Sequence, residues 1–304
     1  MEMKYIYPSA ILLALLFLVS SCKKDNPPAS NPELKFVFTF DTTQTRLDNL
    51  GNPSTIPPGN AAQHPDFEFI AAHYVELIPD PLTLLGEGEI LFMSPIVTSG
   101  GDSAIDFNSL FLASAGDTFL SVPLSDIPPG NYSHIRISVA YQQYSVDVRV
   151  DTTVSTNPPI GFNDFVKTEV FSYLGFNNYI EYALPDQRFS TFGNRLQGFY
   201  GLETEPINAL GGYQIADTGN APQTTVVNPI QASSPIPPGS CLVTGEVQGL
   251  SISGSEQSDV IVEVKISINN SFEWIDSNAN GLYEPLRGEE VVDMGLRGMM
   301  AIVK

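Results

Sequence analysis

Cysteine and histidine are scarce in this chain, and their scarcity limits the chemistry open to it. The 304 residues include two cysteines and three histidines. Cys22 ends an N-terminal apolar run and is expected to be modified, which leaves Cys241 without a partner and excludes an internal disulfide in the mature chain. His64, His73 and His134 show no ligand spacing such as His-x-His, so the sequence does not predict a histidine metal site.

Positive charge is scarce too. Lys and Arg total 14 against 34 Asp and Glu, which gives a formal net charge of −20. This excess repels nucleic acid and anionic lipid surfaces, and it favours solubility outside the cell, cationic partners or a bound divalent metal. We therefore expect no nucleic-acid partner.

Motifs of common enzymes are absent from the sequence as well. There is no Gly-x-Ser-x-Gly, no His-Glu-x-x-His and no phosphate-binding glycine loop. We therefore expect neither an enzyme nor an organic cofactor. A hydrolase that uses paired carboxylates, as in glycoside hydrolysis, is the less favoured alternative, and the sequence does not locate its site.

The longest apolar run, ILLALLFLVSSC from Ile11 to Cys22, lies near the N-terminus. A basic residue (Lys4) precedes it, it is too short to span a bilayer, and small residues stand directly before the cysteine. The sequence Val-Ser-Ser-Cys fits a lipobox. We predict a lipoprotein signal peptide over residues 1–21 and acylation of Cys22. The alternatives are a plain signal peptide and an uncleaved anchor.

Residues 22–33 are polar and carry three prolines, which predicts a flexible tether between the lipid and a folded domain. The Lys-Lys-Asp directly after Cys22 resembles the start of many lipoproteins of the Bacteroidota. This resemblance implies attachment to the outer membrane through the lipid, on the periplasmic or the cell-surface side.

Beyond the tether the chain has strand periodicity and little helical periodicity. From Leu34 to Asp41 apolar and other residues alternate with period two, which is typical of a strand. The one candidate helix is Pro65–Ile78, and the same stretch is compatible with a strand. Further strands are predicted at 89–93, 119–122, 134–139, 145–150, 165–173, 178–184, 196–202, 260–268 and 298–303. The fold class is therefore all-β, with sandwich modules, long loops and little helix.

The chain is long enough for two modules, and we predict a boundary near Asn157–Ile160, where two prolines occur. An N-terminal β-sandwich would then span residues 34–156 and a C-terminal β module residues 157–304. The run Leu124–Val139, with its Pro-Pro-Gly-Asn-Tyr corner, and Ala104–Phe107 resemble prealbumin-like and MbnP-like sandwich domains of lipoproteins. The resemblance implies a prealbumin-like or immunoglobulin-like sandwich. Its copper chemistry is not carried over.

Aromatic residues gather in the second half of the chain and give two interpretations. If they face solvent on one sheet, they can stack on sugar rings. If they face inward, they fill a sandwich core. The candidates for glycan stacking are Tyr173, Tyr179, Tyr182 and Trp274.

The sharpest chemical pattern follows the strand Phe272–Ile275, where the sequence reads DSNANGLYEPLRGE. Alternating side-chain oxygens, a glycine for a sharp turn and a carbonyl after it are typical of a calcium loop. The pattern resembles loops of surface-protein B repeats and dockerin-like modules. The predicted ligands are Asp276, Asn278, Asn280, Leu282, Glu284 and Glu289.

One position departs from this pattern. An EF-hand has a glutamate at the twelfth position of the loop, where this chain has Arg287, so Glu284 or Glu289 must supply the carboxylate. We expect weak affinity for calcium, roughly 0.1–1 mM. The alternative is a structural turn without metal, because Asn and Gly tolerate left-handed backbone.

Together these observations predict a lipid-anchored protein of the cell envelope. Its leading interpretation is a binding or structural surface module stabilised by calcium, with a glycan or an envelope protein as its partner. The alternative is a carbohydrate-binding accessory lipoprotein.

Overall fold

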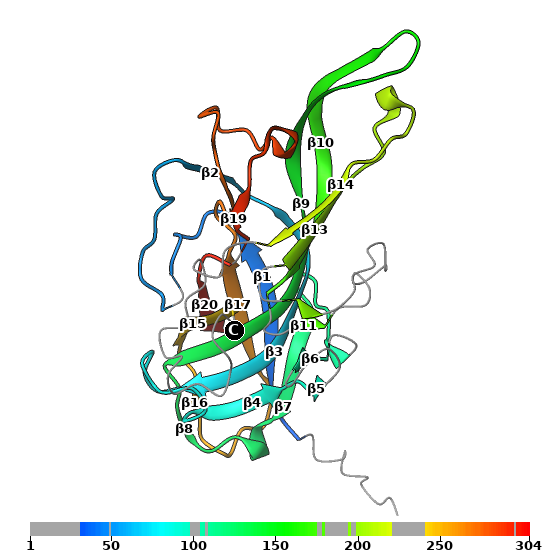
Figure 1. The fold of residues 1–304 in the computed structure, drawn as a ribbon. Coiled ribbons are helices and arrows are strands. Elements are labelled where there is room, and N and C mark those ends of the chain that lie inside the picture. The colour runs from blue at the N-terminus through cyan, green and yellow to red at the C-terminus, as the bar shows by residue number, and fades with distance from the viewer. Residues whose placement is uncertain are drawn as a thin grey trace, which may run out of the picture. The chain divides into compact units, whose positions relative to one another are not determined.

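The computed structural model describes residues 31–304 except 49, 98–103, 107–108, 175–177, 180–193, 196–198, 221–240 and 295. Residues Asn31–Lys304 form one compact unit. The described residues are strands, turns and short 3-10 helices with no α-helix, so the prediction of an all-β fold is confirmed (Figure 1). No helix in these ranges is long and apolar enough to cross a membrane. The signal peptide, Cys22 and Tyr182 lie outside the described residues.

Twenty strands and three 3-10 helices are described. They are, in chain order, β1 (Glu33–Asp41), β2 (Asn60–Gln63), β3 (Asp66–Ile78), β4 (Glu89–Met93), β5 (Ile96–Val97), β6 (Ala104–Ile105), β7 (Thr118–Pro123), η2 (Leu124–Asp126), β8 (Gly130–Asn131), β9 (His134–Val154), β10 (Ile160–Tyr173), β11 (Asn178–Tyr179), β12 (Asn194–Arg195), β13 (Phe199–Thr204), η3 (Asn208–Leu210), β14 (Ala216–Asn220), β15 (Cys241–Gln248), β16 (Ser251–Ile252), β17 (Val260–Ser267), β18 (Phe272–Ile275), η6 (Pro285–Arg287), β19 (Val291–Asp293) and β20 (Met299–Val303).

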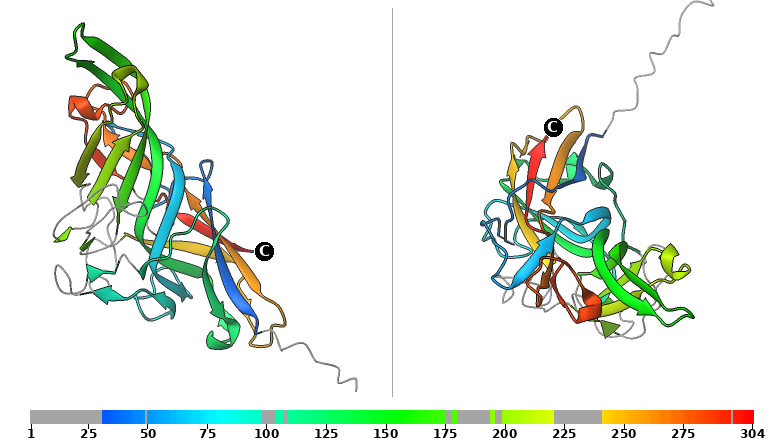
Figure 2. Two further views of the ribbon diagram at one scale, coloured as in Figure 1. Left: turned by 90° about the vertical axis from the view of Figure 1, so that its right-hand side faces the viewer. Right: turned by 90° about the horizontal axis from the view of Figure 1, so that it is seen from above.

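An 11-stranded sheet carries most of the structure, and β9 lies at its centre. Its order is β14-β13-β10-β9-β15-β20-β17-β1-β7, with β3 and then β4 added on the other edge of β9. Two strands share one edge of β9 in turn, because β15 pairs with residues 134–139 and β10 with residues 141–154. Figure 2 shows β3 beside β9, and β9 continuing with β10 into a long hairpin. This strand therefore joins the two ends of the sheet.

The stretch proposed as a helix or a strand at Pro65–Ile78 is a strand. Nine consecutive residues, Ile70–Ile78, are buried. A strand that is covered on both faces has a near-continuous apolar sequence, without the alternation of a half-exposed strand. Its apolar spacing therefore resembled that of a helix as well.

The predicted division into modules at residues 156 and 157 is corrected by the pairing of the strands. This boundary lies in the loop of the β9–β10 hairpin, whose strands pair from Tyr141 with Tyr173 to Val154 with Ile160. Moreover, β1 lies parallel to β17, with Leu34 opposite Val260. Segments from both halves of the chain thus build one sheet and one compact unit.

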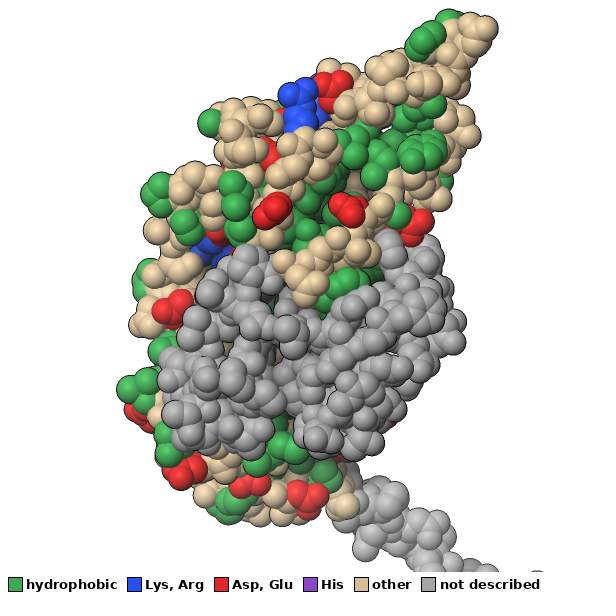
Figure 3. Space-filling view, in the orientation of Figure 1, with side chains coloured by type: hydrophobic (Ala, Val, Ile, Leu, Met, Phe, Trp, Pro, Cys, Tyr) green, Lys and Arg blue, Asp and Glu red, His purple; other side chains and the backbone are tan. Residues whose placement is uncertain are grey.

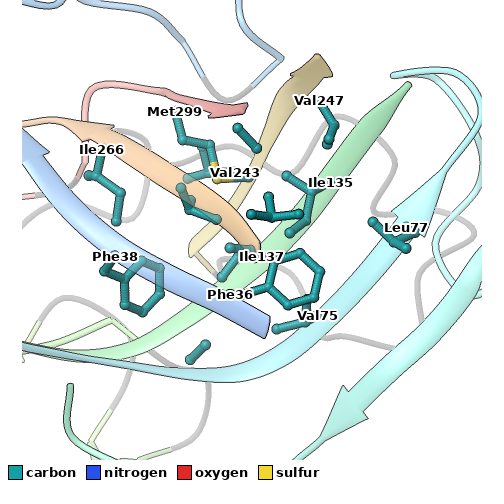
Figure 4. Close-up of a cluster of buried hydrophobic side chains, with 14 of the residues drawn as sticks. Phe36, Phe38, Val75, Leu77, Ile135, Ile137, Val243, Val247, Ile266 and Met299 are labelled. Atoms are coloured by element: carbon teal, nitrogen blue, oxygen red, sulfur yellow. The ribbon is translucent and has the colours of Figure 1, made fainter. Parts of the chain in front are cut away.

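The main core confirms this mixture of the two halves. Phe36 and Phe38 of β1 pack with side chains of β3, β9, β15, β17 and β20 (Figure 4). A second core, rich in aromatic rings, lies where the small sheet β19-β18-β2 packs on β9, β10 and β13. Tyr144, Phe272 and Trp274 are fully buried there. This second core carries the predicted calcium loop.

Candidate functional site

The predicted calcium loop folds as a tight turn directly after β18. The carboxylate of Asp276 accepts the backbone N–H of Asn280 at 3.1 Å and that of Gly281 at 2.8 Å. Gly281 has φ of 72° and Ala279 has φ of 52°, so both take the left-handed conformation that such a turn requires. The N–H of Leu282 donates to Oδ1 of Asn280 at 2.8 Å. The local turn chemistry is therefore formed by hydrogen bonds within the loop.

Glu284 is the point at which several of the predicted ligands meet. Its Oε2 accepts the side-chain amides of Asn278 at 2.9 Å and Asn280 at 2.8 Å. Its Oε1 lies 3.2 Å from Nε of Arg287, whose side chain is half exposed. Glu284 itself is only 5% exposed. The carboxylate is thus held by two neutral amides and one cation that also reaches solvent.

Glu289 adds a second buried carboxylate beside Glu284. Its Oε2 accepts the N–H of Glu284 at 2.7 Å. Its Oε1 is buried and finds no hydrogen-bond partner within the described ranges. A buried carboxyl oxygen without a partner is costly, so this atom could serve as an acceptor for a bound group.

Calcium fits the oxygen types of this loop with one rearrangement. The amides of Asn278 and Asn280 point their nitrogen atoms at Glu284, whereas calcium needs their oxygens. Rotation about the last side-chain bond exchanges the two atoms, and this bond has a broad, twofold preference. In Asn280 the rotation also breaks the hydrogen bond that Oδ1 accepts from the N–H of Leu282. The parts of the chain described contain no group of three or more His, Cys, Asp or Glu side chains that could hold a metal ion. A calcium site in this loop would therefore also need the amide oxygens and the Leu282 carbonyl as ligands.

The loop is anchored in the aromatic core by Tyr283. This ring is 2% exposed and lies 5.1 Å from Phe272 and 5.4 Å from Trp274, between ring centroids. Burial is the main cause that raises the pKa of Tyr283 above its usual value. The carbonyl of Tyr283 accepts the N–H of Arg149 on β9 at 2.8 Å. The loop is therefore fastened to the long hairpin by its backbone and to the core by its ring.

The interpretation of aromatic rings as a glycan-stacking surface is corrected for two residues. Tyr173 and Trp274 are each 1% exposed, so neither ring presents a face to a sugar. Tyr173 lies 5.1 Å from Tyr141 inside the sheet packing, and Trp274 lies in the aromatic core. Tyr179 is in β11, but its side chain and all of Tyr182 lie outside the described set. These two described aromatics fill cores, which was the alternative interpretation of the pattern.

Sequence reasoning located no paired carboxylates, but the structure gathers four glutamates around a cavity of 270 Å³. They are Glu68 of β3, Glu169 of β10, Glu203 of β13 and Glu205, which directly follows β13. Glu169 and Glu203 are direct cross-strand partners. Lys167 lines the same cavity and pairs with Asp66 at 2.5 Å. The cavity is smaller than most small-molecule sites, which hold about 300–1,000 Å³. No local motif could have revealed it, because its members come from three strands.

A larger cavity of 680 Å³ lies between residues 41–47 and 50–53 on one side and the outer face of β15, β17 and β20 on the other. Its lining mixes apolar side chains with Lys265, Glu246 and His134. The sequence pattern did not indicate these residues as a group either.

Comparison with protein-family models, curated proteins and solved structures found no match to this chain.

Proposed function

We propose that this protein is a lipid-anchored module of the outer membrane in the cell envelope, that it acts in binding or as a structural element, and that calcium stabilises it at Asp276–Glu289. The order of its parts supports the proposal. A lipobox ending at Cys22 and a proline-containing tether precede one compact β unit that begins at Asn31. Figure 3 shows acidic side chains spread over one face with few basic ones among them, which suits a soluble surface and a cationic ligand.

The observation that carries the calcium part is the buried Oε1 of Glu289. The other oxygen of Glu289 accepts the N–H of Glu284, and the carboxylate of Glu284 already accepts hydrogen bonds from two side-chain amides. In calcium-bound protein, Glu284 and Glu289 would supply carboxylate oxygens and Asn278 and Asn280 amide oxygens. The bound ion would neutralise two buried acidic groups, which is the source of the expected stabilisation.

The anchor is tested by replacing Cys22. Wild-type cells and cells carrying Cys22→Ser are labelled with an alkyne palmitate analogue and then fractionated. We expect label and membrane association in the wild type and neither in the variant, because the thiol is the acylation site. Cys241→Ser serves as the matched control and should keep both. Equal labelling of Cys22→Ser and the wild type would refute the anchor.

Calcium binding is tested by thermal unfolding of the full chain with calcium chloride and with EDTA. At a tenfold excess of calcium over its dissociation constant, linkage predicts about 1.4 kcal/mol of added stability. Asp276→Ala should abolish the shift, because it removes the first predicted ligand. Asp259→Ala, which lies outside the loop, should retain it. An unchanged midpoint at millimolar calcium would leave the loop as a purely structural turn.

A further inference from the structure

The outer face of the sheet carries an ordered row of unlike side chains beneath residues 41–53. Lys265 of β17 pairs with Met300 of β20, and Met300 is also opposite Glu246 of β15. Glu246 in turn is opposite His134 of β9. Residues directly opposite in a sheet point to the same face. The row therefore presents a cation, an apolar side chain, an anion and an imidazole in that order.

The two charges in this row are kept apart by the strand between them. Lys265 and Glu246 are two strand spacings apart, which is about 10 Å between their backbones. No ion pair joins them in the described structure, whereas Lys35, Lys167 and Lys304 each pair with an acidic side chain. In a chain of net charge −20, a lysine without such a partner is an exception. Its charge contributes to the lowered pKa of Asp41 and of Glu263, but neither carboxylate lies within ion-pair distance of its ammonium group in the described structure. The ammonium group can therefore still contact an anion.

The segment over the row leaves space between itself and the sheet. Leu47 is held by a hydrogen bond from its N–H to the carbonyl of Arg297 at 2.9 Å. Gly298 allows this close approach, because a Cβ there would lie 2.4 Å from Cβ of Leu47 and its φ is 86°. Farther along, the cavity of 680 Å³ opens between Leu50 and the row. That volume lies within the range of small-molecule sites, about 300–1,000 Å³.

The cavity is lined by apolar side chains and by charges of both signs, and this mixture selects a ligand class. Leu47, Leu50, Met300 and Ile302 supply apolar surface to the cavity. Met300 lies between Lys265 and Glu246 in the row. The carboxylates of Glu246 and Asp41 would repel a purely anionic ligand, and the ammonium group of Lys265 would repel a purely cationic one. A ligand with opposite charges at its two ends satisfies both sides.

We propose that this cavity binds a short zwitterionic peptide, with its carboxylate at Lys265, its ammonium group at Glu246 and an apolar side chain over Met300. Length supports the assignment, because three extended residues span at most about 10 Å, which matches the separation of about 10 Å between the backbones that carry the two charges. The cavity shares no residue with the calcium loop. This inference stands or falls independently of calcium and of the lipid anchor.

The test is isothermal titration calorimetry of the full chain in detergent, with EDTA present, using the tripeptide Ala-Leu-Ala as the probe. The same peptide with an acetylated N-terminus and with an amidated C-terminus provides the matched ligands. We expect each blocked peptide to bind roughly tenfold more weakly, because each loses one charge-assisted contact.

Two variants assign the ends of the peptide. Lys265→Met should weaken the free tripeptide roughly tenfold and leave the amidated peptide unchanged, because that peptide lacks the carboxylate. Glu246→Gln should do the same to the free tripeptide while leaving the acetylated peptide unchanged. Lys304→Met removes the same charge outside the cavity and should leave all three affinities as in the wild type.

Three results would overturn the proposal. The first is the absence of binding heat with the free tripeptide at millimolar concentration. The second is equal affinity for the free and the blocked peptides, and the third is an equal loss of affinity for the free tripeptide in Lys304→Met and Lys265→Met. The first two use wild-type protein alone, so they hold even if a variant fails to fold.

Discussion

Glu76 and Glu284 each organise a loop, but their surroundings differ. Glu76 is fully buried, and its Oε2 lies 3.0 Å from Nη1 of Arg136, which is 1% exposed. The other oxygen of Glu76 accepts the N–H groups of Gly86 and Gly88 at 3.0 and 2.7 Å. Glu284 instead pairs with Arg287, whose side chain is 51% exposed.

The comparison shows which glutamate can change its partner. Arg136 also donates to the carbonyl of Thr83 at 2.6 Å, so both members of the inner pair are held on several sides. Gly88 is part of this arrangement, because a Cβ there would lie 2.4 Å from the carbonyl oxygen of Leu77. The cation of the outer pair, Arg287, also pairs with Asp151 at 2.6 Å, and its side chain is 51% exposed. It can therefore leave Glu284 without being left buried or unpaired. Glu76 is therefore suited to fix a loop, and Glu284 to exchange Arg287 for a metal ion.

The largest expected effect comes from breaking the inner pair. Glu76→Gln leaves the guanidinium of Arg136 buried without its anion, which should cost about 3–5 kcal/mol. Urea unfolding measures the loss. Glu284→Gln, measured in EDTA, should lower the free energy of unfolding by less, because its partner Arg287 is already exposed to solvent. Equal losses of stability in the two variants would contradict the expected difference between the buried and the exposed ion pair.

A double replacement sharpens this prediction. Glu76→Leu combined with Arg136→Met removes both charges together. We expect the double variant to be more stable than Glu76→Gln, because no buried charge is left alone. A double variant that is no more stable than Glu76→Gln would mean that the hydrogen bonds to the loop, rather than the charge pair, dominate.

His73 offers a third case on the same strand, an ionisable side chain that burial holds neutral. Burial lowers its pKa from 6.5 to about 4. Below pH 6.5 the unfolded chain binds a proton at His73 that the folded chain does not bind. The contribution of neutral His73 to the free energy of unfolding is therefore fully present above pH 6.5, and it is lost as the pH falls toward 4. The loss contributed by this group should approach about 3 kcal/mol.

The histidine prediction is measured by urea unfolding between pH 4 and 7. His73→Leu should flatten the pH dependence relative to the wild type, because the titrating group is gone. His64→Gln, at an exposed position, is the control and should keep the wild-type slope. If both variants keep that slope, His73 does not govern the acid sensitivity.

The smallest expected effect concerns the outer pair. Arg287→Met frees Oε1 of Glu284 and should raise calcium affinity by roughly twofold, since exposed ion pairs contribute little. Calorimetric titration with calcium chloride measures the change. Arg149→Met is the matched control, because Arg149 stacks on Phe165, 5.1 Å from the ring centroid, rather than pairing with a loop carboxylate. Weaker calcium binding in Arg287→Met would show that Arg287 supports the site.

Much of the strand pattern was predictable from local sequence. The predicted strand at Glu89–Met93 has the same bounds as β4, and Phe165–Tyr173 lies within β10. The segments at 134–139 and 145–150, predicted separately, are one continuous strand, β9. Between them the chain stays buried on both faces, which removes the alternation on which sequence reasoning depends.

The calcium loop was predictable in part for the same local reason. Asp276 and Gly281 are close in sequence, and their turn follows from side-chain capping and left-handed backbone. The position of Glu284 between two amides also depends on a short segment. The burial of Trp274, in contrast, depends on the core that it shares with Tyr144 of β9 and Tyr200 of β13. No local pattern reports which face of a strand will be covered.

The sequence by itself determined that this chain is all-β, where most of its strands run and which loop has the oxygen pattern of a calcium site. Alternation and turn chemistry act over a few residues, so they can be deduced without the fold. Only the tertiary structure decided that both halves form one unit, and that Lys265, Met300, Glu246 and His134 stand in one row. Strand partners such as Leu34 and Val260 are selected by packing across the whole chain, and packing also decides which charges are buried.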